Sequence, residues 1–250
     1  MSNWRYKRTI SKNRPVGNVW LVYHPKLKKH GYFKYPTSLS NTHSGPLAAN
    51  EYIAYQLGKE LNLPMARTRL RVIHGKSGVV SERIKRRRLY NWKELNRRYS
   101  NVFSKLKHPY LLLKMFIFDV WLVNIDRNNR NIILYREKNS RKYKFYLIDH
   151  GLTGFGSFTW KHVNWDSSYW EDIKRYNNNY LTGLRRYIKK HQKKLWSYVW
   201  EIQSFPDLKV RQIITKIPPD LLTEHQKNVL ITFLVQRKHR LHTIIERFIK

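Results

Sequence analysis

The chain has 250 residues, 41% of them hydrophobic and 14% aromatic, so it can bury a substantial core as one compact domain or as two lobes that share a cleft, and it is no disordered basic tail. It contains no cysteine, which excludes disulfides and thiolate metal sites. Lysines and arginines number 50 against 16 acidic residues, which gives a formal net charge of +34.

This positive charge predicts attraction to polyanions, with nucleic acid first and an acidic protein or an anionic membrane surface next. The basic residues are spread along nearly the whole sequence, so they also fit an ordinary solvated surface. Nonspecific nucleic-acid binding at low salt is therefore the expectation. The first residues lack the apolar core of a signal peptide, and no apolar run is long enough to cross a bilayer. We expect a cytoplasmic protein with no membrane insertion.

The N-terminal third reads as strands and one helix. Residues 1–14 are polar and basic and indicate an extended or loosely packed lead-in. After a turn at residues 15–18 come two β-rich runs, 19–23 and 31–36, of which the second places Lys34 between two aromatic residues. Alternation along a strand turns Lys34 to the face opposite Phe33 and Tyr35, and taken alone it is a solvent-exposed strand residue.

A helix is predicted from Pro46 to about residue 61, because Ile53, Leu57 and Leu61 recur on one face. Glu51 is its only acidic residue before Glu60, and taken alone it is an ordinary exposed helix glutamate. An alternating strand around residues 70–72, a turn at 75–78 and a further run at 79–84 follow.

The next segment begins with the densest basic run, Lys85–Arg88, which fits a solvated linker or a phosphate-facing patch. A helix over residues 90–99 and a loop ending at Pro109 lead to a second helix with a strong apolar pattern. Two β-rich runs, 131–135 and 143–148, then flank a turn.

A polar loop separates that second helix from the first of these β runs. It reads Asn124-Ile125-Asp126-Arg127-Asn128-Asn129-Arg130-Asn131, and Ile148-Asp149-His150-Gly151 follows the second β run. Phosphoryl transfer needs an acceptor hydroxyl held in line, usually by an aspartate, and magnesium held by hard oxygen ligands. Asp126 and Asn131 have the Asp-to-Asn interval of the protein-kinase catalytic loop, and Asp149 stands where that scheme has Asp-Phe-Gly. Taken singly, such residues more often cap or turn the backbone.

These two motifs resemble those of the HipA-like kinases, bacterial relatives of the protein and phosphatidylinositol kinases. The family pattern is roughly Asn-x-Asp-Arg-His-x-x-Asn followed by Ile-Asp-x-Gly, and this chain departs from it at Asn128, which replaces the histidine. The resemblance implies an α+β, bilobal kinase-like fold, with a small β-rich lobe in residues 1–84 and a helical lobe in residues 85–250. It also implies ATP and Mg2+ as cofactors.

The resemblance assigns roles to particular residues. Asp126 would orient or deprotonate the acceptor hydroxyl, while Asn131 and Asp149 would hold the metal. Lys34 would contact the nucleotide phosphates and Glu51 would position it. The order of elements further suggests that backbone groups of Val80, Ser81 and Glu82 would meet the adenine.

Neighbouring residues and the C-terminal part have supporting roles. Asp119 and Asn124 are expected to brace the catalytic loop, and Arg127 to bind either a phosphate or a carboxylate. The glycine-rich residues 151–159 suggest a loop beside the active site. The rest is expected to be helical, over residues 180–190, 193–203, 208–215 and from 224 onward.

The implied activity is phosphorylation of serine or threonine on a protein, with a toxin-type growth regulator and a restraining antitoxin-like partner as further implications. The acceptor is open, as is autophosphorylation on the loop from Thr37 to Ser44. The competing hypothesis is a non-catalytic basic protein, a pseudokinase that binds nucleic acid.

Overall fold

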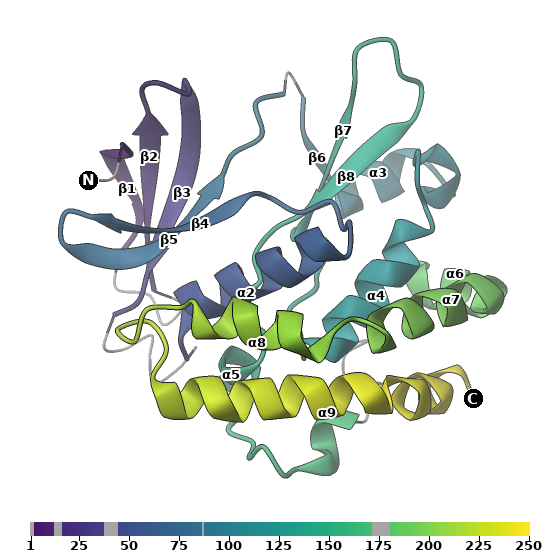
Figure 1. Ribbon diagram of the computed structural model, residues 1–250. Helices are drawn as coiled ribbons and strands as arrows, with labels where there is room; N and C mark the ends of the chain where they lie inside the picture. The colour runs from purple at the N-terminus through teal and green to yellow at the C-terminus, as the bar shows by residue number, and fades with distance from the viewer. Residues whose placement is uncertain (1–2, 13–16, 38–44, 87, 172–180) are drawn as a thin grey trace.

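Among the described residues, five antiparallel strands and the helix α2 (Leu47–Glu60) form the N-terminal part of the protein, and the remaining helices gather beside and below them (Figure 1). The computed structural model describes residues 3–12, 17–37, 45–86, 88–171 and 181–250. This arrangement of a sheet-rich region and a helical region confirms the predicted α+β class. The predicted turn at residues 15–18 and the loop at 37–45 fall largely outside the described residues, as does the predicted helix start at residue 180.

The strands of the large sheet run in the order β1-β2-β3-β5-β4. Their bounds are β1 Arg5–Ser11, β2 Asn18–His24, β3 Lys29–Tyr35, β4 Thr68–Ile73 and β5 Lys76–Glu82. Of the two forms expected for the lead-in, extended or loosely packed, it takes the extended one as the edge strand β1, which follows the buried side chain of Trp4. Its exposed, basic composition is typical of an edge strand that must not pair further.

The side chains of β3 alternate between the two faces of the large sheet. Phe33 and Tyr35 enter a small core on one face of the sheet with Trp4, Val22, Ile73 and Val80. Lys34 turns to the other face, opposite Val19 of β2 and Val79 of β5. Helix α2 (Leu47–Glu60) packs against β3, β4 and β5 on this second face, where small and branched residues such as Ala54 and Leu57 are fully buried.

A second, smaller sheet joins the two regions. It consists of β6 (Tyr90–Asn91), β7 (Ile132–Arg136) and β8 (Tyr143–Leu147) in that order. Leu147 is tied to the chain that follows α2, because its N–H donates to the Pro64 carbonyl at 2.8 Å and its carbonyl accepts from the Ala66 N–H at 3.0 Å. The end of β8, and with it the start of the Asp149 segment, is thus fixed beneath the large sheet. The division of the chain at residue 84 stays a prediction.

Helix α4 (Leu111–Trp121) is the centre of the helical region. Every residue from Leu112 to Trp121 is buried, and α7 (Gln192–Gln203) and α9 (Glu224–Ile249) pack against it. Its sequence is apolar on all sides except for Lys114 and Asp119, and such a helix is expected to be buried all round. The remaining elements are α3 Trp92–Arg98, α5 Phe155–Lys161, α6 Leu184–Lys190 and α8 Asp207–Thr215, with two short 3-10 turns, Phe103–Lys105 and Ser168–Glu171.

Two short segments differ from expectation. The predicted helix at 90–99 begins as strand β6, and α3 starts only after Asn91, whose side chain accepts from the Glu94 N–H in a capping box. The glycine-rich residues after Gly151 are not all loop, because α5 begins at Phe155, directly after Gly154 with its positive φ of 49°. The Ser157 hydroxyl, bonded to the carbonyls of Val123 and Leu152, holds this helix against the end of α4. No helix in the described part of the chain is long and apolar enough to span a bilayer.

Candidate active site

Lys34 is the meeting point of three separate segments. Its ammonium group contacts the carboxylate of Glu51 on α2 and lies 2.8 Å from Oδ1 of Asp149, which follows β8. Glu51 is only 3% exposed, whereas the side chain of Asp149 is 49% exposed. The structure therefore brings together the predicted lysine, its predicted partner glutamate and the predicted metal-binding acid, with one oxygen-bearing side chain still open to solvent.

The charges at this junction stabilise one another. Burial alone would lower the pKa of Lys34, but the carboxylates of Asp149 and Glu51 outweigh it and raise that pKa. The Lys34 charge is in turn the main reason that the pKa of Asp149 is lowered. Both groups are thus ionised at neutral pH. Asp149 adopts a positive φ of 59°, which an aspartate tolerates better than most residues.

Asp126 and Asn131 lie in one loop and are hydrogen-bonded to each other. The Asn131 amide donates to the Asp126 carbonyl at 2.6 Å and to its Oδ2 at 3.3 Å. Asn128 donates to Oδ1 of Asp126 at 3.1 Å, so the residue that replaces the family histidine directly supports the predicted catalytic carboxylate. Burial raises the pKa of Asp126, and the charge of Asp149 raises it further.

Arg127 ties this loop to the Asp149 segment from behind. Its guanidinium binds both oxygens of Asp119 at 2.8 and 3.1 Å and donates to the carbonyls of Asn131 and Ile148 at 3.0 and 3.2 Å. The side chains of Arg127 and Asp119 are 0% exposed. Asn124 completes the set by donating to Asp119 at 2.7 Å. Of the two predicted partners of Arg127, a phosphate or a carboxylate, the structure shows the carboxylate of Asp119. Asp119 and Asn124 support the loop as expected.

Two residues of this framework were not singled out from the sequence. His150 is buried and its Nε2 lies 2.7 Å from the Arg127 guanidinium, while Asn50 on α2 donates to the Gly151 carbonyl at 2.8 Å. Asn50 could have been noticed in the sequence, because it is a polar residue on the apolar side of the predicted helix and directly precedes Glu51. Together these contacts hold the segment around Asp149 from both sides.

The predicted adenine contacts need a correction. Val80 pairs with Phe33 and Arg69, and Ser81 pairs with Tyr32 and Thr68, so both lie inside the sheet with a strand on each side.

Glu82 is occupied in the same way. Its N–H donates to the Arg67 carbonyl at 2.8 Å, and its side chain lies 3.0 Å from the Lys29 ammonium. Val80 and Ser81 are thus committed to the paired sheet, and the N–H of Glu82 is bonded to the chain just before β4. Even the next N–H, of Arg83, donates to the His30 carbonyl at 2.9 Å. Backbone groups beyond the sheet begin only after Arg83.

A pH effect follows from the buried state of His150. Burial, with the charges of Arg127 and Lys34 beside it, lowers the pKa of His150 well below its ordinary value. Below about pH 6.5 the unfolded chain takes up a proton that the folded protein does not, so stability should fall there by up to about 1.4 kcal/mol per pH unit. Urea unfolding at pH 7.5 and 5.5 measures this, and His150→Gln should reduce the pH dependence. Equal slopes in both proteins would contradict it.

The comparisons with known proteins agree with this geometry at the level of fold. No model of a protein family matches the chain, and no curated protein matches it in sequence. Its structure is similar to that of a proinflammatory kinase of Helicobacter pylori, CtkA, with a TM-score of 0.67 and 18% sequence identity over 98% of this chain and 95% of that chain. It is also similar to HipA of Shewanella oneidensis MR-1, solved with HipB and its operator DNA. That match has a TM-score of 0.62 and 13% identity, and covers 100% of this chain and 66% of the HipA chain.

The fold is that of a kinase-like protein. CtkA and HipA are both HipA-like, so the chain has the fold of the HipA-like kinases, and the family resemblance seen in its two motifs is confirmed at the level of the fold.

Proposed function

We propose that the protein transfers the γ-phosphoryl group of ATP, with Mg2+, to a serine or threonine hydroxyl of another protein. The observation that carries this proposal is the contact of Lys34 with both Glu51 and Asp149, which joins the sheet, α2 and the segment after β8. The hydrogen bond from the Ile148 N–H to the Asn131 carbonyl, at 3.1 Å, keeps the loop that carries Asp126 beside Asp149.

The donor set fits magnesium and nucleotide phosphates. The Asn131 amide nitrogen is used by Asp126, and within the described residues no group donates to its Oδ1, so that oxygen is left for a cation. Asp149 holds Lys34 through Oδ1 and has a half-exposed carboxylate. The described residues contain no group of three or more His, Cys, Asp or Glu side chains suited to a metal. Mg2+ commonly takes one or two protein oxygens and completes its shell with phosphates and water, which matches this pair.

Each residue then has a defined task. When bound, Mg2+ neutralises the charge on the transferring phosphoryl group. Asn131 and Asp149 would hold it, and Lys34 would bind the phosphates from the side of the sheet while Glu51 keeps it in place. Asp126, held by Asn128 and Asn131, would accept or orient the proton of the acceptor hydroxyl. The adenine would be contacted by backbone groups that follow Arg83 in the chain.

The test is transfer of labelled phosphate. Purified protein with Mg2+ and γ-labelled ATP is expected to label itself or a protein in a lysate, and an excess of EDTA should stop the reaction, because the phosphate charge is then uncompensated. Phosphoamino-acid analysis identifies the acceptor side chain. Labelling that is unaffected by EDTA, or that is confined to tyrosine, would contradict the proposal.

The charge of +34 favours a second candidate, a non-catalytic protein that binds nucleic acid. Such binding should weaken steeply with salt and survive Asp149→Ala, since Asp149 contributes nothing to a basic surface. The direct support that Asn128 gives to Asp126 speaks for catalysis over this alternative.

We also propose that the protein halts growth and that a protein partner restrains its activity. They draw on the neighbour HipA, whose structure was solved with HipB and DNA. Induced expression of the wild-type chain should slow growth of its host, whereas Asp126→Ala should not. Equal toxicity of both proteins would remove phosphorylation from the growth effect.

A further inference from the structure

Four cations surround a group of tyrosine rings at one end of the small sheet. They come from four separate segments, which are the chain before β6, helix α3, the 3-10 turn that follows α3 and the end of β7. They are Arg88, Arg98, Lys105 and Arg136, and all four side chains are exposed.

Two of the rings, those of Tyr90 and Tyr143, carry three of the cations. Arg88 and Arg98 both lie over the ring of Tyr90, with Cζ at 5.5 and 5.0 Å from its centre. Tyr90 contacts Tyr143 at 5.7 Å between ring centres, and Cζ of Arg136 lies 5.1 Å from the centre of the Tyr143 ring. Distances of this size are those of cation–π contacts.

A third ring, that of Tyr99, carries the fourth cation. The hydroxyl groups of Tyr99 and Tyr143 are 3.4 Å apart, and Nζ of Lys105 lies 5.3 Å from the centre of the Tyr99 ring. Because Tyr143 contacts both of the other tyrosines, the four cations occupy one continuous surface. We call these seven residues the cation–tyrosine cluster.

Carboxylates of the described residues do not balance this charge. None of the four cations forms a salt bridge or a side-chain hydrogen bond within the part of the chain that the structure describes. The acid of the β7–β8 hairpin, Glu137, binds the Lys144 ammonium at 2.7 Å, and Glu94 of α3 accepts from the Asn91 N–H at 2.7 Å. Like charges held so close repel one another, so a bound polyanion would stabilise them.

Two further lysines extend the positive surface at the tip of the hairpin. The Lys107 N–H donates to the Tyr143 carbonyl at 2.8 Å, and the Lys142 ammonium contacts the Ser104 carbonyl. These contacts place the chain around the 3-10 turn beside the hairpin tip. The cations of both segments therefore lie at the same end of the small sheet.

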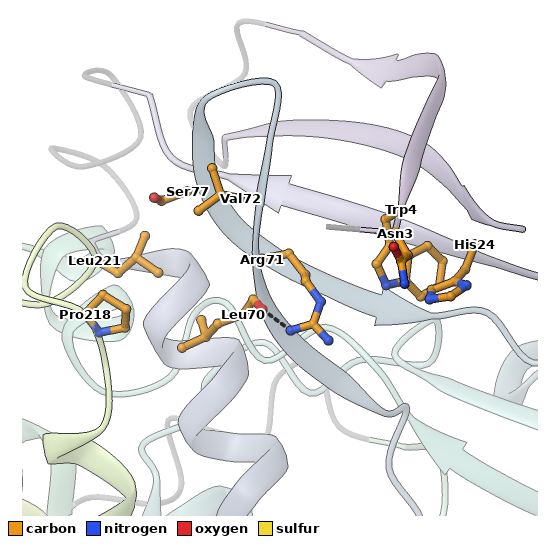
Figure 2. A pocket seen from close by; sticks show the side chains of 9 residues that line it. All are labelled: Asn3, Trp4, His24, Leu70, Arg71, Val72, Ser77, Pro218 and Leu221. Carbon is orange, nitrogen blue, oxygen red and sulfur yellow. Dashed lines mark hydrogen bonds between the residues drawn. The ribbon is translucent and has the colours of Figure 1, made fainter. Parts of the chain in front are cut away.

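A pocket of about 500 Å3 beside β4 shows the contrast (Figure 2). Only one of the nine residues that line it is a lysine or an arginine, and this residue, Arg71, donates from NH1 to the Leu70 carbonyl at 2.7 Å. That pocket therefore lacks the clustered cations that a polyanion requires, whereas the cation–tyrosine cluster has them on an exposed surface.

We propose that the cation–tyrosine cluster binds the phosphate backbone of a double-stranded nucleic acid. Guanidinium and ammonium groups spread over an exposed surface match the regularly spaced phosphates of a duplex. A single strand is disfavoured, because its bases need open aromatic rings for stacking, whereas Tyr90 and Tyr143 are only 6% and 2% exposed. A membrane surface is disfavoured as well, because the most exposed large apolar side chains of the described residues lie elsewhere, at Val72, Trp200 and Leu208.

The cluster is separate from the candidate active site. Asn131 and Asp149 lie at the base of the β7–β8 hairpin, whereas Arg136 and Tyr143 lie toward its tip. The two sites share no residue. Binding of a duplex at this surface is therefore compatible with phosphoryl transfer and does not depend on it.

The experiment measures the fluorescence anisotropy of a labelled duplex of about 20 base pairs, titrated with the full chain at a series of salt concentrations. The logarithm of the affinity should fall linearly with the logarithm of the salt concentration, with a slope of about 0.9 for each neutralised phosphate. Arg98→Ala/Arg136→Ala should reduce this slope by about 2 and weaken binding at least about tenfold at low salt. Arg98→Lys/Arg136→Lys keeps both charges and should retain most of the slope.

The matched control is Arg5→Ala/Arg8→Ala on β1. It removes two exposed arginines from a strand that lies away from the small sheet (Figure 1). Because salt screens charges at that distance, the control should change the affinity by less than about twofold. Urea unfolding of each variant shows whether it is folded, and both double alanine variants should keep the wild-type midpoint, because they remove only exposed side chains.

Other polyanions test the kind of partner. Duplex RNA and duplex DNA share the phosphate chemistry, so binding of either supports the proposal and the tighter of the two identifies the source. Equal loss of binding in the β1 control, equally tight binding of an oligothymidine of the same length, or displacement of the duplex by polyglutamate at equal charge would each overturn it. None of these measurements requires ATP or catalysis, so failure here is distinct from failure of the proposed phosphoryl transfer.

Discussion

Alanine at Asp126 or at Asp149 is expected to abolish phosphoryl transfer, with a rate at least about 10³-fold below that of the wild type. Asp126→Ala removes the carboxylate that would orient the acceptor hydroxyl. Asp149→Ala removes the carboxylate that would hold the metal and one of the two partners of Lys34. The measurement is the initial rate of phosphate incorporation from γ-labelled ATP under saturating Mg2+.

Loss of folding must be separated from loss of chemistry. Asp149 is half exposed and Lys34 keeps Glu51, so Asp149→Ala should unfold in urea close to the wild-type midpoint. Asp126→Ala loses two side-chain hydrogen bonds within one loop, and its urea midpoint is measured beside its activity. Asp220→Ala, which removes an exposed aspartate from the turn before α9, is the matched control and should retain full activity. Transfer that persists in either active-site variant would remove that acid from the mechanism.

Arg127→Leu is expected to cost about 3–5 kcal/mol of folding stability, because it leaves the buried carboxylate of Asp119 without its partner. It also removes the donors to the carbonyls of Asn131 and Ile148, so the loop and the Asp149 segment lose their common support. Urea denaturation followed by tryptophan fluorescence measures the loss.

A double variant sharpens this test. Asp119→Leu/Arg127→Leu should cost less than the sum of its single variants, since it leaves no unpaired buried charge. Glu60→Ala, which breaks the exposed pair between Glu60 and Lys209, should leave stability nearly unchanged. A loss below about 1 kcal/mol for Arg127→Leu would contradict the bracing role.

The site residues that could be predicted from the sequence are those that belong to short local motifs. The interval from Asp126 to Asn131 and the Asp149 motif are local, because each lies within a loop or directly after a strand. Lys34 was assigned to the face opposite Phe33 and Tyr35 by strand alternation, and that is the face it occupies. The contact of Lys34 with Asp149 joins residues 115 positions apart, which the order of elements suggests and only the folded chain shows.

The parts that failed depend on neighbours that a linear pattern does not reveal. Val80 to Glu82 look like a strand leading to a hinge, but whether their backbone groups are free depends on pairing with β3 and β4 on both sides. The glycine-rich stretch contains α5 because Ser157 finds carbonyl partners in a different segment. The sequence left open whether Arg127 binds a phosphate or a carboxylate, and only the packing of α4 beside the loop shows that it binds Asp119.

The most direct test of the account is a crystal structure of the protein with Mg2+ and a non-hydrolysable ATP analogue. The account predicts a metal ion bound at about 2.1 Å by an oxygen of Asp149 and by Oδ1 of Asn131, with the Lys34 ammonium on the nucleotide phosphates. A nucleotide bound elsewhere, or a metal that contacts neither residue, would contradict it.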